Sequence, residues 1–149
     1  MAKRSGRNVL LKVAIGRPTD NPSGLTFLQV GAMRGKNIKF EWSTGDATAD
    51  DSPDFTEESL VTFKKVTISG DGVYNDAASS NQETIEDHIL TPGASTDYQP
   101  HIWVQWIYPN GKTFQGPFLA TSWNIDAPHD NVMTYSMEAT SAGAVTKIA

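Results

Sequence analysis

The sequence predicts a mainly β fold, a small β-barrel or sandwich of about seven or eight strands with one α-helix and a long acidic loop. Short segments rich in Val, Ile, Thr and aromatic residues follow one another along the chain, and Gly, Pro, Asn or Asp separates them. One segment, residues 79–90, shows instead the apolar spacing that is typical of a helix. Together these two patterns favour a β fold with an attached helix.

The strand pattern recurs in segments that are each bounded by turn-forming residues. These segments span residues 8–15, 26–34, 37–42, 64–69, 101–108, 113–125 and 132–140. In the third segment Ile38, Phe40 and Trp42 alternate with polar residues, as in a strand with one buried face. Gly35-Lys36 is expected to be the turn of a hairpin between the second and third strands.

The later strands carry turn signals of their own. Asn110-Gly111 predicts a tight hairpin. Gly116-Pro117 predicts a bulge or an edge position, because proline cannot donate a backbone hydrogen bond. The stretch 70–72 is expected to bend or end its strand. Alternation predicts that Val66 and Ile68 point inward, and that Tyr135, Met137 and Ala139 share one face of the last strand.

The single predicted helix has a recognisable start and a packing face. Ser80 is expected to cap its first turn, with Glu83 as the partner in a capping box. Ile85, Ile89 and Leu90 are expected to form the face that packs on the sheet.

The composition sets bounds on the class of protein. The chain has 149 residues, which we interpret as one domain, 1–149, with a basic N-terminal arm at about 1–7 and a long loop at about 43–62. A net charge of −5 disfavours stable DNA binding, and the lack of cysteine excludes disulfides. Because no apolar run is long enough for a membrane span, we expect no membrane partner and an origin in the cytoplasm.

Charge is unevenly distributed along the chain. Residues 1–17 contain basic side chains and no acid, whereas residues 46–58 contain acids and no base. These segments are either two solvated polar stretches or complementary ends that meet between neighbouring subunits. Under the second interpretation the interface candidates are Lys3, Arg4, Arg7, Arg17, Asp46, Asp50, Asp51, Asp54, Glu57 and Glu58.

No catalytic or metal-binding pattern emerges from the residues. The acids between 46 and 57 imitate the spacing of a calcium loop, but Asp51 stands where the sharp turn requires glycine. His88, His101 and His129 show no ligand spacing. We therefore expect no cofactor, no metal and no enzymatic activity.

Four stretches, in their order and spacing, resemble the major tail tube protein of long-tailed bacteriophages and of gene transfer agents. They are residues 36–40, the acidic stretch 46–52, the strand exit 66–76 and a C-terminal pair, 116–123 with 134–146. The resemblance implies a barrel-like sandwich of which six copies close a ring. It also implies that rings stack around a tape-measure protein and conduct double-stranded DNA in transit, without binding it stably. The implied partners are copies of the chain and the tape-measure, tail terminator and baseplate proteins, and the implied location is the virion tail, assembled in the host cytoplasm.

A stacked ring needs one contact that closes and one that does not. The loop 16–24, the acidic loop and the basic arm are expected to lack partners in their own monomer and to make the axial contacts. Trp103 and Trp106 lie on opposite faces of one predicted strand. Either both belong to the monomer's own core or rim, or one of them faces a neighbour.

A conducting lumen should not grip phosphate groups, so an acidic or neutral lining suits it. Glu41, Asp126 and Glu138 are the lumen candidates, because they occupy polar faces of predicted strands. Two alternatives stay open at this point. One is a carbohydrate-binding β-sandwich module that stacks sugars on its tryptophans, and the other is a related secretion-system tube subunit.

Overall fold

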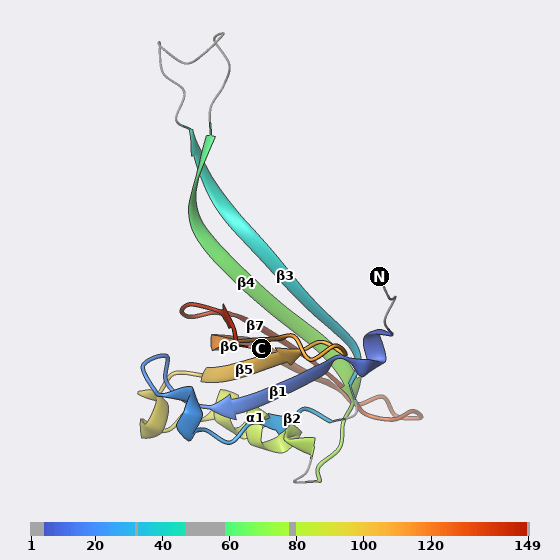
Figure 1. The fold of residues 1–149 in the computed structure, drawn as a ribbon. Coiled ribbons are helices and arrows are strands. Elements are labelled where there is room, and N and C mark those ends of the chain that lie inside the picture. The colour runs from blue at the N-terminus through green and yellow to red at the C-terminus, as the bar shows by residue number, and fades with distance from the viewer. Residues whose placement is uncertain (1–4, 32, 47–58, 78–79, 149) are drawn as a thin grey trace, which may run out of the picture.

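The computed structural model describes residues 5–31, 33–46, 59–77 and 80–148, and a β-sheet with one α-helix dominates this part of the chain (Figure 1). The helix α1 spans Gln82–Leu90, and short 3-10 turns lie at η1 (Gly6–Asn8), η2 (Pro22–Gly24) and η5 (Ala94–Thr96). The strands are β1 (Leu10–Ile15), β2 (Leu28–Gln29), β3 (Met33–Asp46), β4 (Ser59–Val73), β5 (His101–Ile107), β6 (Thr113–Asp126), β7 (Thr134–Ser141) and β8 (Thr146–Lys147).

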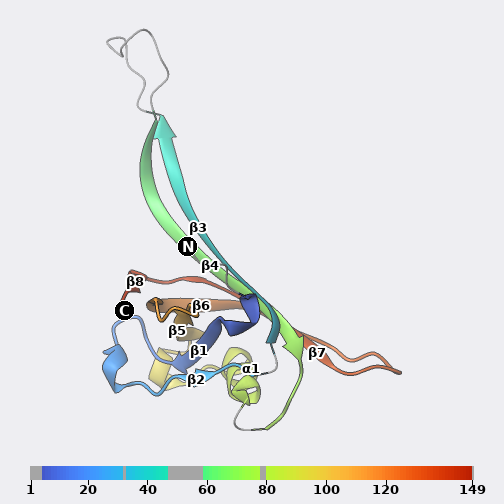
Figure 2. The same cartoon turned by 45° about the vertical axis from the view of Figure 1, so that its right-hand side comes forward.

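All eight described strands join one antiparallel sheet in the order β2-β1-β5-β6-β7-β4-β3, and β8 pairs with β6 beside this path. The predicted mainly β class with one helix is therefore confirmed. The sheet is not closed into a barrel, since β2 and β3 stand at opposite ends of this order. It curls instead, so that β3 and β4 pass over β1, β5 and β6, while α1 and β2 lie on the side away from the far end of β3 and β4 (Figures 1 and 2).

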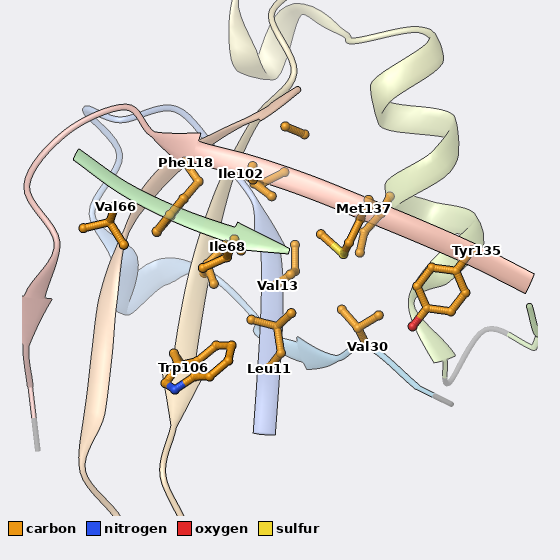
Figure 3. Close-up of a cluster of buried hydrophobic side chains, with 14 residues drawn as sticks. Leu11, Val13, Val30, Val66, Ile68, Ile102, Trp106, Phe118, Tyr135 and Met137 are labelled. Carbon is orange, nitrogen blue, oxygen red and sulfur yellow. The ribbon is translucent and has the colours of Figure 1, made fainter. Parts of the chain in front are cut away.

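The core fills the concave side of this curled sheet (Figure 3). Val66 and Ile68 of β4 face the layer formed by β1, β5 and β6, where Leu11 and Phe118 are almost fully buried. Burial of each such side chain contributes about 1.5–3 kcal/mol. The alternation predicted for β4 and β7 is confirmed, because Val66, Ile68, Tyr135, Met137 and Ala139 are all buried.

Both β3 and β4 are longer than the sequence predicted. The expected turn at Gly35-Lys36 is wrong, because both residues lie inside β3 and pair with Asp71 and Gly70. A Cβ at Gly35 would meet the end of the Asp71 side chain, which would have to move aside for a larger residue. The strand also does not end at 70–72; the irregularity at this level belongs to β3, where Arg34 is the extra residue between Met33 and Gly35.

The predicted loop 43–62 is shorter than expected. Strand β3 continues to Asp46 and strand β4 starts at Ser59, so both ends of the predicted loop belong to the sheet. Residues 47–58, which contain most of the calcium-like spacing, lie outside the described residues.

The start of α1 differs from the predicted capping box. Ser80 Oγ donates to the Asn75 and Ala77 carbonyls, and Glu83 is exposed. The residue at the N-cap is Asn81, which is in the left-handed conformation with φ 60° and whose side-chain amide donates to the Val13 and Leu28 carbonyls. The helix is therefore anchored to the sheet by side chains that reach backbone groups far away in the sequence.

Gln82, at the first turn of α1, is the strongest of these anchors. Its side chain is fully buried, and Nε2 donates to the carbonyls of Gly31 at 2.7 Å and Val73 at 3.1 Å. Its Oε1 accepts from the Asn75 amide at 2.7 Å. Tyr135 adds a hydroxyl bond of 3.0 Å to the Gly31 carbonyl, and its burial raises its pKa.

The β5–β6–β7 region follows the sequence closely. The Asn110-Gly111 hairpin is confirmed, with Gly111 at φ 92°. Of the two alternatives expected at Gly116-Pro117, the bulge is wrong, because both residues pair in register with β5 and the register shift of β6 lies between Ala120 and Ser122. The edge position fits, since both residues lie between the segments of β6 that pair with β8 and with β7. Glycine is needed at 116 because the Val145 backbone passes 2.8 Å from the position of a Cβ there. Among the described residues, no helix has the length and apolarity that a membrane crossing requires.

Gln82→Ala tests the anchoring of α1. We expect a loss of about 2–4 kcal/mol in the free energy of unfolding, because three backbone groups lose a buried partner. Urea unfolding of dilute, unassembled protein measures it. Thr84→Ala on the exposed side of the same helix is the control, and a loss for Gln82→Ala no greater than for this control would contradict the assignment.

Candidate assembly interface

Strands β3 and β4 form an arm that projects beyond the rest of the protein (Figures 1 and 2). We define the arm as residues 39–46 of β3 and 59–65 of β4. Its large apolar side chains are exposed in the monomer, with 56% of Trp42 and 75% of Phe63 open to solvent. Exposed apolar surface of this kind is typical of a site that binds another molecule. The other exposed apolar residues on and beside the arm are Phe40, Leu60 and Val61.

The register of the arm separates two faces. Phe40 pairs with Val66 and Trp42 pairs with Lys64, so these four residues share the side that continues the core, the core-side face. Phe40 contacts Phe114 of β6 edge-on, with 5.5 Å between the ring centroids. Further along, Trp42 has lost the cover of the protein body, and the Lys64 Nζ lies 5.8 Å from its ring centroid.

The opposite face of the sheet carries mainly polar side chains, although Phe63 lies on it in the arm, and all three lumen candidates belong to it. Glu41 is on β3, Glu138 pairs with Ser69 of β4, and Asp126 lies at the end of β6 in the same alternation. All three are exposed. A shallow polar hollow of about 450 Å³ beside Glu138 belongs to the same face.

This polar face is not uniformly acidic. Glu41 lies 3.6 Å from the Lys39 Nζ and pairs across the strands with Lys65. Across β3, β4, β7 and β6 it presents both signs of charge, with Glu41, Asp71, Asp126 and Glu138 against Lys39 and Lys65.

A second apolar surface lies between α1 and β6. Ile89 and Leu90 of the helix and Trp123 and Ile125 of the strand line a groove of about 550 Å³, with Glu86 at its side. We call this the α1 groove. Trp123 stacks on Tyr135 with 5.1 Å between centroids. It also donates from Nε1 to Glu86 Oε2 at 2.9 Å, so its ring is held in place before any partner arrives.

The packing face predicted for α1 needs one correction at this groove. Ile85 is buried and Ile89 is half-buried, as expected. Leu90 was expected to pack on the sheet, but 82% of its surface is exposed. Its apolar side chain has no cover within the described part of the monomer.

Carboxylates gather around the same helix. Burial raises the pKa of Tyr74, and the nearby charges of Glu86, Glu83, Asp76 and Asp87 raise it further. On the other side of α1, burial lowers the pKa of His88, whose Nε2 lies 2.9 Å from the His101 carbonyl. The exposed side of α1 therefore carries mainly negative charge.

The interface candidates from the sequence fall into two groups. Arg17 has partners in its own monomer: it lies 3.3 Å from Asp20 and 3.6 Å from Asp97, and its carbonyl accepts from Trp103 Nε1. The expectation that loop 16–24 lacks local partners is therefore wrong. Arg7 lies within η1 and Asp46 is the last residue of β3, and nothing further is described of their side chains. The remaining candidates, Lys3, Arg4, Asp50, Asp51, Asp54, Glu57 and Glu58, lie outside the described residues.

Trp103 and Trp106 belong to the monomer itself. Both are buried, although they lie on opposite faces of β5. Loop 16–25 covers Trp103, while Trp106 is part of the main core. Of the two interpretations left open by the sequence, the one with a tryptophan of β5 facing a neighbour is wrong. Sequence reasoning missed the arm and the α1 groove, which combine residues far apart in the chain.

A curled sheet that extends beyond its own core and exposes apolar strands defines a structural subunit of an assembly. The chain belongs to the phage tail tube protein family, whose family model matches residues 3–147. This is a family of structural proteins and not of enzymes, as the sequence predicted. Among curated proteins, none matches this chain.

Solved structures agree with this assignment. The tail of an empty gene transfer agent (GTA) particle, with C6 symmetry, is 26% identical with a TM-score of 0.76, over 99% of this chain and 100% of that chain. The virion of a native GTA particle gives 26% identity and a TM-score of 0.75 over the same shares. The SPP1 tail tube shares the fold, at 14% identity and a TM-score of 0.60, over 96% of this chain and 77% of that chain. The resemblance found in the sequence is thereby confirmed.

Phe63→Thr tests whether the apolar side chains of the arm serve the monomer. Because Phe63 is exposed, we expect the free energy of unfolding of dilute protein to fall by less than about 1 kcal/mol. Ile68→Ala, at the buried end of the same strand, should cost about 2–5 kcal/mol. Thermal or urea unfolding compares them, and equal losses would show that the arm is part of the monomer's core.

Proposed function

We propose that copies of this chain close into rings, and that the rings stack into a tube through which double-stranded DNA passes to the host. The observation that carries this proposal is the arm, whose core-side face continues the monomer's core but has no cover of its own. A second copy is the partner that this family offers for such a face. The C6 symmetry of the GTA tail supports six copies in each ring.

The polar face of the sheet is suited to the lumen of this tube. It carries Glu41, Asp126 and Glu138, so phosphate groups passing along it meet carboxylates as well as lysines. Strong phosphate contacts would hold DNA in a salt-dependent way, and a mixed or acidic lining avoids this. We propose that a tape-measure protein occupies this lumen before DNA does, and that terminator and baseplate proteins close the two ends. Assembly would take place in the host cytoplasm, before DNA passes.

Stacking would draw on the two charged segments of the sequence. Lys3, Arg4 and Arg7 near the N-terminus match the acidic stretch that contains Asp50, Asp51, Asp54, Glu57 and Glu58. Opposite charges would bring neighbouring rings into register more than they would add affinity. Arg17 belongs to this contact only through the part of its side chain that Asp20 and Asp97 leave open.

Concentration-dependent assembly tests the proposal. We expect purified protein to change from monomers to rings or tubes as its concentration rises, because the arm has no cover in the monomer. Size-exclusion chromatography with light scattering measures the change, and negative-stain electron microscopy shows the particles. Protein that stays monomeric at all concentrations and salt conditions would overturn the proposal.

Charge reversal tests the stacking contact separately. Asp50→Lys with Asp51→Lys and Asp54→Lys should raise the concentration at which tubes form, and the effect should shrink as salt is added. The control for net charge compares the single reversals Asp51→Lys and Asp130→Lys, because both change the charge equally and Asp130 is an exposed acid outside this segment. Tubes that form at the wild-type concentration in low salt would show that the acidic stretch does not guide stacking.

A further inference from the structure

We propose that the α1 groove is the receptor for the arm of a second copy, with Trp42 seated in the groove and Lys64 facing the carboxylates of α1. This inference rests on the proposed function, in which copies of the chain assemble. It specifies which surface of one copy contacts which surface of the next.

The first part of the argument is that the core-side face of the arm needs a cover. At the base of the arm, Val66 is buried and Phe40 contacts Phe114 of the same copy. Two residues closer to the tip of the arm, Trp42 is more than half exposed, and its cross-strand partner is Lys64. An apolar sheet face that starts buried and then continues into solvent favours a partner that extends the cover.

The second part is that the α1 groove is apolar and already formed in the monomer. Trp123 is fixed by its stacking on Tyr135 and its hydrogen bond to Glu86, so its ring presents a rigid wall. Leu90 forms the opposite side and is largely exposed. A rigid aromatic wall beside an exposed leucine suits a planar apolar side chain such as that of Trp42, since little side-chain freedom is lost on contact.

Complementary charge favours the arm as the segment that binds in the groove. Glu86 lines the groove, and Asp76, Glu83 and Asp87 line a separate hollow beside the same helix. In the described part of the chain, no ion pair involves these acids or Lys64. The core-side face of the arm offers the complement, an exposed aromatic ring directly beside an ammonium group. Opposite charges would steer this contact and fix its register.

The positions of the two surfaces require two copies. The far end of the arm and α1 lie on opposite sides of the sheet in both views (Figures 1 and 2). A copy therefore offers its arm to one neighbour and its groove to another. Such a contact is heterologous, and its repetition gives either a closed ring or an open stack.

Engineered cysteines test the proximity directly, because the native chain has none. Thr44→Cys lies on the same face of β3 as Trp42, and Asp87→Cys lies one helical turn before Leu90, so neither replaces a residue of the apolar contact. Ser43→Cys with Asp87→Cys is the matched control, since Ser43 is the adjacent residue on the opposite face. Under mild oxidation of assembled protein, we expect the first pair to form intersubunit disulfides at least about tenfold faster, because the Cβ atoms must come within about 4.5 Å.

A charge exchange gives an independent readout. Lys64→Glu should raise the concentration required for assembly by about fivefold or more, and Asp87→Lys in the same chain should restore most of the loss. Lys65→Glu is the matched control, because Lys65 is the next residue on β4 but points to the other face. We expect its effect to be smaller and not to be rescued by Asp87→Lys.

The outcomes separate this inference from the proposed function. If tubes form but the two cysteine pairs react equally, and Lys64→Glu behaves like Lys65→Glu, the docking in the α1 groove is wrong while the tube stands. If the wild-type protein does not associate at all, both are overturned.

Discussion

The structure depends on one constraint: an apolar face of a β-sheet has to be covered, and this sheet is longer than the body that covers it. Strands β3 and β4 run from the centre of the core, where Ile68 is buried, to the arm, where Trp42 is exposed. Within the arm β3 and β4 pair only with each other, so alternate backbone groups of both strands point to open edges. The apolar side chains of the arm are not covered there either, so the arm is incomplete both in strand pairing and in apolar burial.

The uncovered arm suits the molecule to assembly, and the core of the monomer contains none of its residues. The core-forming residues lie on β1, β4, β5, β6 and β7, and these strands bury each other without help from the arm. The helix is held by Gln82 and Asn81, which bond to backbone groups of the sheet and its loops. The residues that stabilise the monomer therefore differ from those that would bind a second copy. A substitution in one set should have little effect on the role of the other.

The sequence predicted the parts whose burial follows a local period. Val66 and Ile68, or Tyr135 and Met137, alternate with polar neighbours because one face of the strand is inside. Gly35-Lys36 carries a local turn signal, but pairing with Gly70 and Asp71 of β4 overrides it. The parts of β3 and β4 near the tip of the arm were not predicted as strand either, because their strand structure depends on pairing between residues far apart in the sequence.

Residues 43–46 have no apolar alternation, and only their hydrogen bonds to β4 make them a strand. The α1 groove could not be predicted, because it joins residues about thirty positions apart, Leu90 and Trp123, whose proximity is a property of the topology. Leu90 itself was misassigned because an apolar residue at helical spacing indicates a contact without saying whose. In the described part of the monomer Leu90 lacks the expected contact, and its exposure agrees with the docking surface that we propose.

The two faces of the arm carry different chemistry only as long as its register is fixed. Lys64 and Lys65 are identical and adjacent, yet one stands beside Trp42 and the other opposite Glu41. A slip of one residue would exchange them. Two irregularities hold the register, an extra residue at Arg34 near the base of β3 and another at Thr62 on β4, whose hydroxyl donates to the Ser43 carbonyl. Bulges at both ends of the paired segment thus decide which side chains of the arm lie beside Trp42 and which lie beside Glu41, and in the tube that we propose this distinction would separate the wall from the bore.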